Sequence, residues 1–334
     1  MMKNKKTRIK PVGPQKSGLM LDIWKAKYLY MLLLPFVVWL ILFSYVPMAG
    51  IVLAFKEYNA MDGIWASPWV GLKHFQRIFS TPAAVKSIIT TITLSFQRII
   101  FEFPVPIIMA IIITEMRGQK VKKLFQTILT FPHFLSWVTV SAILISIFSE
   151  SGAVNSVLNS LGVNSLPFLS NSILFKAMLF ITHNWKEMGW SAIIYMATIS
   201  SIDPGLYEAA EIDGASRLKQ IWHITLPALL PLISLQLILK VGHVMNAGFS
   251  QIFNMRNSVV ADSVQILDAY IYDITFKSIP NYGFSTAVGL FKSIINFILL
   301  MLANQLVGKM TGEKMWSFEK KAKSKKHSKT KGAK

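Results

Sequence analysis

Residues 207–215 read YEAAEIDGA and residues 224–227 read ITLP, so a polar stretch interrupts a chain that is otherwise strongly apolar. The stretch carries acidic side chains, small residues and a glycine. Asp203 and Pro204 precede it and favour a helix start, because Asp caps the first turn and Pro fits the first helical position. The sequence therefore predicts a short exposed helix between two apolar segments. A polar element in that place needs a partner.

The helix is predicted to end at Gly214, which can adopt the left-handed conformation that closes a helix. A second helix is predicted to start at Ser216, and Pro227 and Pro231 are expected to mark the entry into the next apolar segment. Two short helices that meet at a glycine make a rigid elbow on which a second protein could dock. The alternative is an interfacial hairpin that only joins two membrane spans.

The composition places the chain in a membrane. Hydrophobic residues make up 53% and charged residues 15%, with a mean hydropathy of +0.46, whereas soluble domains carry about 25% charged residues. The absence of cysteine excludes disulfides and thiolate metal sites. The net charge of +19 would suggest nucleic acid in a soluble protein, but much of it lies at the chain ends. There it is expected to contact anionic lipid, and no nucleic acid partner is predicted.

Six membrane-spanning helices are predicted, each at least about 20 residues long and able to cross a hydrocarbon core of about 30 Å. They cover residues 28–55, 86–115, 125–149, 173–200, 228–250 and 285–307. The first is expected to be a retained signal anchor, because no small-residue cleavage site follows it. The predicted fold class is an all-α integral membrane protein.

Lysine and arginine counts predict the orientation. With both ends inside, the cytoplasmic segments hold 24 of the 35 basic residues and the outer segments hold six, which fits the excess of positive charge on cytoplasmic loops. The predicted organisation is a basic cytoplasmic segment over 1–27, a transmembrane domain over 28–308 with a cytoplasmic loop at 201–227, and a basic tail over 309–334. No separate extracytoplasmic domain is expected.

The sequence lacks the motifs of an energy source of its own. It contains no G-x-x-x-x-G-K-[ST] loop, no H-E-x-x-H and no G-x-S-x-G. The six histidines are scattered, so no metal site is predicted. Transport driven by a partner or a gradient is the expected role. One alternative is a cation-coupled secondary transporter, although the sequence shows no internal repeat of the kind that such transporters usually have. The other alternative is a membrane scaffold or sensor.

The signature E-A-A-x-x-x-G followed by nine residues and I-x-L-P is matched at every position from Glu208 to Pro227. It resembles the "EAA" signature of the membrane subunits of binding-protein-dependent ABC importers. The resemblance extends over the whole chain, with six spans, both ends inside and the motif between the fourth and fifth. In detail the chain is most similar to the carbohydrate-uptake branch, the relatives of the maltose permease, and within it to polysaccharide or oligouronide permeases.

This resemblance implies the type I ABC importer permease fold in the bacterial cytoplasmic membrane. It also implies a second permease subunit, two cytoplasmic ATPase subunits that bind ATP and Mg, and an extracytoplasmic binding protein that delivers an oligosaccharide. The chain itself would then hold no cofactor and would not be an enzyme. The elbow would be the coupling helix in a cleft of the ATPase, with Glu208, Ala209, Ala210, Asp213 and Gly214 as the residues in contact.

Polar residues inside the spans point to the substrate path, because charge in hydrocarbon is costly unless it faces a cavity or a partner. Aromatic faces and hydrogen-bonding groups suit sugar rings, and the candidates in the fourth span are Trp185, Lys186, Glu187 and Trp190. Those in the fifth span are Gln236, Lys240, His243 and Asn246, because Gln236, Lys240, His243 and Ala247 follow a stripe of 3.6-residue spacing and Asn246 lies beside it. Packing against neighbouring helices is the alternative for both sets.

The charges within the spans predict the kind of substrate. Arg98 and Glu102 lie four residues apart and are expected to pair, with a proline bend just beyond them. If the cations Arg98, Lys186, Lys240 and Lys292 and the anions Glu102 and Glu187 all faced one cavity, its net charge would be about +2. Such a cavity favours an acidic, uronate-containing oligosaccharide of the alginate type. The alternatives are another small solute, or a second permease subunit that supplies the missing carboxylates.

Overall fold

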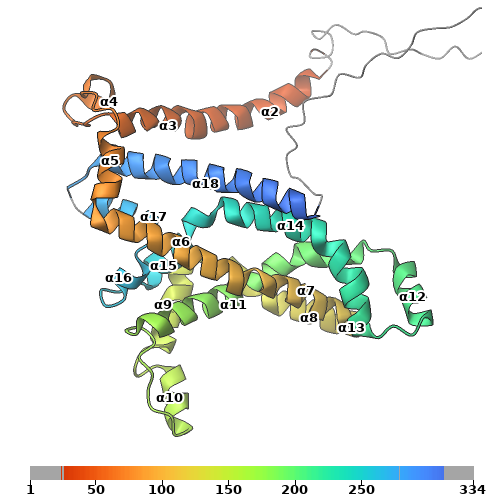
Figure 1. Cartoon of the computed structure of the whole chain (residues 1–334). Coiled ribbons are helices and arrows are strands. Elements are labelled where there is room, and N and C mark those ends of the chain that lie inside the picture. The colour runs from red at the N-terminus through yellow and green to blue at the C-terminus, as the bar shows by residue number, and fades with distance from the viewer. Residues whose placement is uncertain (1–23, 25, 278, 312–334) are drawn as a thin grey trace, which may run out of the picture.

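A computed structural model describes residues 24, 26–277 and 279–311, which are largely helical (Figure 1). Within these ranges there is no β-strand, and one isolated antiparallel bridge joins Lys56 to Trp69. The expected basic segments 1–27 and 309–334 lie almost wholly outside the described residues. The predicted all-α class is confirmed for the part of the chain that is described.

The helices of the first half are α2 (Lys27–Leu40), a π-helix (Ile41–Tyr45), α3 (Val46–Met48), a 3₁₀ helix (Ala49–Phe55), α4 (Gly63–Ala66), α5 (Lys73–Ser80), α6 (Pro82–Glu102), α7 (Pro104–Glu115), α8 (Gln119–Thr130), a 3₁₀ turn (Phe131–Phe134), α9 (Trp137–Ile147) and α10 (Ala153–Ser160). Those of the second half are α11 (Ser172–Ser200), α12 (Pro204–Ile212), α13 (Arg217–Gln220), a π-helix (Ile221–Thr225), α14 (Leu226–Gly242), a 3₁₀ turn (Val244–Asn246), α15 (Phe249–Met255), α16 (Ala261–Val264), α17 (Leu267–Tyr272), a π-helix (Asp273–Lys277) and α18 (Tyr282–Thr311).

Four helical segments of the described residues are long and apolar enough to cross a membrane, and they cover Lys27–Phe55, Pro82–Glu115, Arg217–Gly242 and Tyr282–Lys309. The second of them is interrupted at Phe103, as expected from Pro104, which has no N–H to continue the helix. Helix α11 has 29 residues but is not among the four. Its middle is polar, because it carries Asn184, Lys186 and Glu187.

The predicted third span over 125–149 is not a straight helix. The segments Gln119–Phe134 and Trp137–Ile147 meet at an angle of 100°, and together they count as one broken span or a re-entrant loop. Pro132 lies in the 3₁₀ turn that ends the first segment, and Leu135 is extended. Ser136 then caps the second segment by accepting a hydrogen bond from the Thr139 amide at 3.2 Å. The apolar composition hid this break, which proline and the cap impose.

The predicted fifth span over 228–250 is also corrected. A continuous helix runs from Arg217 to Gly242, so Pro227 and Pro231 lie within it and do not mark its entry. The chain then leaves the helix and enters the left-handed region at Ala247 (φ 44°) and Gly248 (φ 76°). A Cβ at Gly248 would stand 2.7 Å from the guanidinium carbon of Arg98. The turn therefore wraps closely around a buried arginine, and glycine permits the approach.

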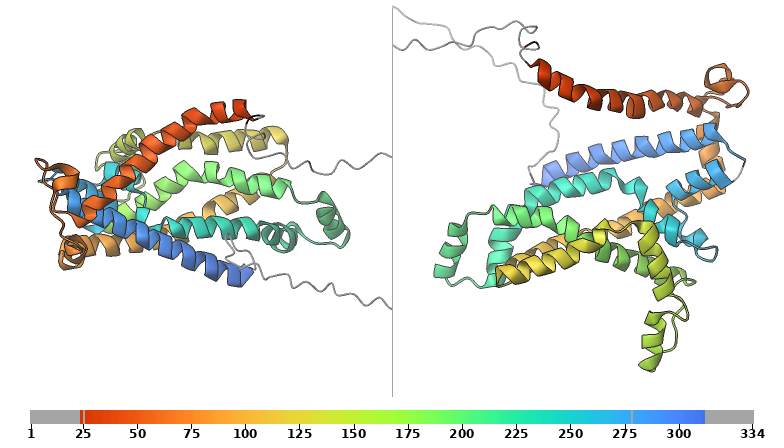
Figure 2. Two further views of the ribbon diagram at one scale, coloured as in Figure 1. Left: turned by 90° about the horizontal axis from the view of Figure 1, so that it is seen from above. Right: turned by 180° about the vertical axis from the view of Figure 1, so that it is seen from behind.

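Different helices project from the two ends of the molecule. Helix α12 projects from one end, and the start of α2 and the end of α18 lie at that same end (Figures 1 and 2). Helix α10 projects at the other end, while α2 runs apart from the main body and contains no buried residue. The largest buried cluster joins α6, α9, α11 and α15 through residues such as Leu94, Val140, Leu179 and Ile252.

Candidate functional site

The elbow at α12 is built as its local sequence predicts. The Asp203 carboxylate accepts a hydrogen bond from the Gly205 amide at 2.9 Å, and Pro204 is the first helical residue. The helix ends at Gly214 in the left-handed conformation (φ 73°). The Ala215 amide then donates to the Ala210 carbonyl at 2.8 Å and the Gly214 amide to the Glu211 carbonyl at 3.0 Å, the pair of bonds that closes a Schellman motif.

The elbow is exposed and held at its base. Helix α12 contains no buried residue, and Ile212 is 87% exposed. The Tyr207 hydroxyl lies 2.9 Å from the Thr225 hydroxyl, which ties α12 to the helix that continues into the membrane. Of the residues expected at the ATPase, Ala210 is half-buried, and the other four are exposed, namely Glu208, Ala209, Asp213 and Gly214.

Three cavities follow one another along the inner helices. The first, of about 560 Å³, is lined by Glu102, His183, Glu187, Trp190, Gln236 and Lys240, among others. The second, of about 210 Å³, shares Glu102, His183 and Lys240 with it and adds Arg98, His243, Asn246 and Ala247. The third, of about 330 Å³, shares His183, Asn246 and Gly248 with the second and adds Trp137, Gln251, Asp268 and Lys292. Because neighbouring cavities share these lining residues, the three cavities form one row. The first cavity is the one nearest α12, beside the last turns of α11.

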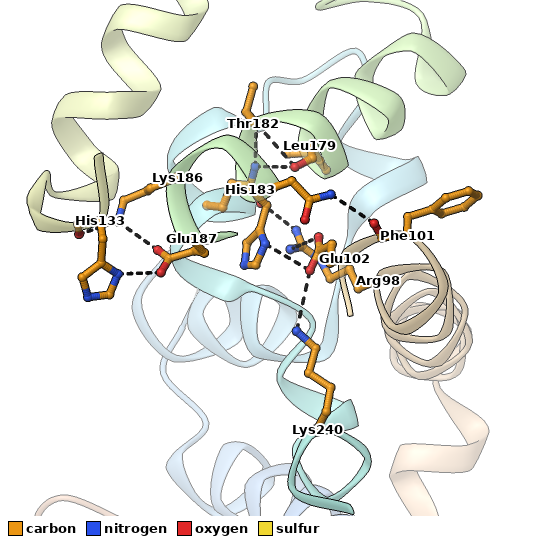
Figure 3. Close-up of polar contacts among 12 residues, drawn as sticks. Arg98, Phe101, Glu102, His133, Leu179, Thr182, His183, Lys186, Glu187 and Lys240 are labelled. Carbon is orange, nitrogen blue, oxygen red and sulfur yellow. Dashed lines mark hydrogen bonds and ion pairs between the residues drawn. The ribbon is translucent and has the colours of Figure 1, made fainter. Parts of the chain in front are cut away.

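A buried charge network separates the first two cavities (Figure 3). Arg98 donates to Glu102 at 2.8 Å and to Gln251 at 2.7 Å, so the expected Arg98–Glu102 pair is confirmed. Glu102 also lies 3.1 Å from His183 and 3.7 Å from Lys240. The side chains of Arg98 and Glu102 are only 4% and 2% exposed, whereas that of Lys240 is 38% exposed. Lys240 is therefore the most exposed member of this network, ahead of His183 at 21%, and a ligand in the cavities can reach it.

A second polar cluster holds the break in the third span against α11 (Figure 3). Lys186 is buried and donates to the His133 carbonyl at 2.8 Å and to Glu187 at 2.9 Å. The His133 ring lies 2.6 Å from the second Glu187 oxygen and stacks on Trp190 with ring centroids 4.5 Å apart. A Cβ on Gly189 would overlap the backbone of Leu129. These contacts fix the 100° bend to the middle of α11.

The candidate path residues divide accordingly. Gln236, Lys240, His243 and Asn246 all line the row of cavities, together with Glu187 and Trp190. Lys186 lines none of the three cavities and is occupied by the His133 carbonyl and Glu187. Trp185 is exposed and lines none of them either. The candidates that line the row therefore come from α14, from the turn that follows it, and from Glu187 and Trp190 of α11.

Asp268 is a charged residue of the row that sequence reasoning missed. Its carboxylate holds Lys292 of α18 at 2.6 and 2.8 Å. The expected balance of about +2 counted Lys292 without this partner and also counted Lys186, which lines none of the cavities. The charged side chains that do line the row are the cations Arg98, Lys240 and Lys292 and the anions Glu102, Glu187 and Asp268, so their formal charges cancel and the expected excess of positive charge is wrong. Asp268 lies between the predicted fifth and sixth spans, and the available signal was a single acidic residue within the apolar run 266–271.

Two histidines of the site were also missed. His133 follows Pro132 at the break of the third span, and His183 lines all three cavities. The proline was the sequence signal for the break, but nothing local indicated which residue of α11 would meet His133. No group of three metal-ligating side chains occurs among the described residues.

An ion cluster ties the outer segment together before α18 begins. Asp273 accepts two hydrogen bonds from Arg256 at 2.8 and 3.0 Å, one from Gln265 at 3.1 Å, and lies 3.1 Å from Lys277. Partial burial would raise the pKa of the Asp273 carboxyl, but hydrogen bonds from Arg256, Gln265 and Lys277 outweigh it and hold that pKa below its usual value. The carboxylate therefore stabilises this segment while it is ionised.

Comparison with known proteins gives matches over most of the chain. The family described as "Binding-protein-dependent transport system inner membrane component" matches residues 104–312. The polygalacturonan/rhamnogalacturonan transport system permease protein YteP of Bacillus subtilis (strain 168) is 40% identical over 300 residues, which cover 90% of this chain and 93% of that protein. The family match includes α12 and the broken helix of α8 and α9.

Two solved structures share the fold. A chain of a bacterial ABC transporter involved in the import of the acidic polysaccharide alginate superposes with a TM-score of 0.81 at 34% identity, covering 88% of this chain and 99% of that one. A bacterial alginate ABC transporter in complex with alginate pentasaccharide-bound periplasmic protein gives 0.81 at 33% identity, with coverages of 89% and 99%. Both cover nearly the full length of the solved chains.

Proposed function

We propose that this chain, which belongs to the binding-protein-dependent transport system inner membrane component family, carries acidic oligosaccharides. The chain is the permease of a carbohydrate ABC importer and an integral membrane protein. Its substrates are uronate-containing oligosaccharides, such as fragments of pectin or alginate. Two of the similar proteins serve polysaccharides of this kind, since one is a polygalacturonan/rhamnogalacturonan permease and the other imports alginate.

The position of Lys240 carries the proposal for an acidic substrate. Its side chain is 38% exposed and lies 3.7 Å from Glu102, so the pair is loose. It lines both the first and the second cavity, while Trp190 lines the first. An ammonium group at the junction of two cavities can meet a sugar carboxylate, and an indole beside it can stack on the sugar ring.

The elbow at α12 supports docking of an ATPase subunit at the cytoplasmic side. Its small residues allow close approach, and the helix that leaves it runs without interruption from Arg217 to Gly242. Lys240 stands in the last turn of that helix. A movement of the docked elbow would therefore be transmitted to the cavities by one rigid helix. Such a link would couple ATP hydrolysis in the partner subunits to the alternation of the permease between two rigid states.

The proposed assembly contains this chain, a second permease subunit, two ATPase subunits that bind ATP and Mg, and an extracytoplasmic binding protein in the bacterial cytoplasmic membrane. Both termini would be cytoplasmic, because the described ends of α2 and α18 lie at the α12 end (Figure 2). The unpacked face of α2 and the row of cavities are then completed by the second permease and by lipid.

Uptake by the reconstituted complex tests the function. Proteoliposomes that contain the complex, ATP and the binding protein should take up trigalacturonate, and uptake should stop with a non-hydrolysable nucleotide but not with a sodium or proton ionophore. Arrest by an ionophore would favour the cation-coupled alternative. Equal uptake of trigalacturonate and its neutral methyl ester, unchanged by Lys240→Ala, would refute the acidic substrate class.

A further inference from the structure

The third cavity contains an ion pair that faces the path. Lys292 lies in α18, ten residues after its first residue, Tyr282, and Asp268 lies in the first turn of α17. The ammonium contacts both carboxylate oxygens, at 2.6 and 2.8 Å. Both side chains line the cavity, with exposed fractions of 18% for Lys292 and 21% for Asp268. A ligand in that cavity can therefore touch the pair.

The Arg98–Glu102 pair differs in both access and origin. It is sealed, and its two members stand on successive turns of one helix, α6. Asp268 and Lys292 come from two different elements, so the geometry of a single helix does not hold them together. The pair also shares its cavity with Trp137, whose ring stacks on His183 with centroids 6.1 Å apart and lies 5.3 Å from the Lys186 ammonium.

A lysine within a membrane span is costly while it has no counter-charge. If a substrate carboxylate were its partner, Lys292 would be left unpaired whenever the path was empty. We propose, on the basis of the acidic-substrate function proposed above, that Asp268 is a placeholder carboxylate. It pairs with Lys292 in the empty path, and a uronate carboxylate of the passing oligosaccharide takes its place.

This exchange discriminates between acidic and neutral sugars. A uronate replaces one carboxylate by another around the same ammonium, so the charge of Lys292 stays compensated. A neutral sugar cannot compensate it and leaves the Asp268–Lys292 pair intact. Competition by Asp268 also weakens the hold on the acidic substrate, which allows its release toward the next cavity. Lys292 and Asp268 are thus the residues that set specificity at the outer part of the row.

Uptake of trigalacturonate and of its methyl ester by the full complex in proteoliposomes tests the pair. In Asp268→Asn the half-saturating concentration of trigalacturonate should fall about tenfold, because close charge pairs are coupled by about 1.5 kcal/mol or more. In Lys292→Gln it should rise about tenfold. The ester should respond to neither change. The double variant Asp268→Asn/Lys292→Gln has no unpaired charge and should retain the fold, while its preference for the acid should be weaker than in the wild type, because only Lys240 remains to meet a carboxylate.

The exposed pair Lys86–Asp262, at 3.0 Å, is the matched control from outside the cavities. Lys86→Gln and Asp262→Asn should leave both half-saturating concentrations unchanged. If acid and ester shift together in the variants of Asp268 and Lys292, the pair is only a structural tie and the placeholder role is overturned. A preference for the acid that is as strong in the double variant as in the wild type overturns the placeholder role and leaves the acidic-substrate function standing. A wild-type complex that takes up acid and ester equally overturns the acidic-substrate function as well.

Discussion

The substitution Gly189→Ala probes the contact that seats the broken third span against α11. A Cβ added at Gly189 would overlap the carbonyl group of Leu129 and would come within 2.7 Å of the Thr130 amide nitrogen. All three of these nearest atoms belong to the backbone of α8, so no side chain can rotate out of the way. The two segments would have to separate, and the cluster around Lys186 and His133 would separate with them.

The magnitude follows from two opposing terms. Alanine is favoured over glycine in a helix interior by about 1 kcal/mol. Inserting an extra carbon into a well-packed contact costs about 1–3 kcal/mol, and a rigid backbone partner places this site at the upper end. The net loss is therefore about 2 kcal/mol, which lowers the unfolding temperature by about 4–8 °C at about 2–4 °C per kcal/mol.

Thermal unfolding of the purified complex, followed by the fraction that still elutes intact after heating, measures the loss. Gly289 of α18 is the matched control, since an added Cβ there meets no atom within 4 Å. Gly289→Ala should be neutral or stabilising by up to about 1 kcal/mol. Equal changes in unfolding temperature for Gly189→Ala and Gly289→Ala would refute the argument. The predicted loss comes from the contact between α11 and α8, and replacing a glycine elsewhere should not produce it.

Three further predictions concern the charge network, the elbow and the outer cluster. Glu102→Gln leaves the buried Arg98 without its counter-charge, so a loss of about 3–5 kcal/mol should reduce the yield of folded complex, and adding Arg98→Met should restore part of it. Gly214→Asp, at a left-handed position, should abolish ATPase stimulation by the loaded binding protein without reducing the permease in the membrane; retained stimulation would remove the elbow from coupling. Because the native pKa of Asp273 is lowered, its stabilising effect is present above about pH 4 and is lost as the pH falls through the lower native value, so wild type and Asp273→Asn should differ in thermal stability at neutral pH and converge in acid.

The elbow could be predicted from the sequence because its determinants are local. Asp203, Pro204 and Gly214 each act within one or two turns of their own position, and each has the conformation or hydrogen bond expected of it. The end of the fifth span could not be predicted in the same way. Gly248 turns there to make room for Arg98, and that arginine is 150 residues away in the sequence.

The role of Lys186 shows the same limit within the site. Its charge and its aromatic neighbours suggested a sugar contact, but the side chain is used by the carbonyl of His133 at a helix break 53 residues away. The average hydropathy of the third span gives no sign of that break, although Pro132 is a local signal for it. Gln236 and Lys240 stand on α14 and both line the first cavity, as residues on one face of a helix share an environment. His243 and Asn246 of the same predicted stripe line the second cavity from the turn beyond the end of that helix.

The charges inside the membrane divide by access, and access decides which of them bears on the cargo. Arg98 with Glu102, and Lys186 with Glu187, are pairs within one helix each. Their cations are buried and also bond to another element, Arg98 to Gln251 and Lys186 to the His133 carbonyl. Sealed pairs contribute little to selection, because a ligand cannot exchange with a group that it cannot reach. Lys240 and Lys292 are more accessible, and each has a carboxylate that a ligand could replace. Selection for an acidic sugar therefore depends on the free energy of carboxylate exchange at these two lysines, and a sum of charges over the spans does not measure it.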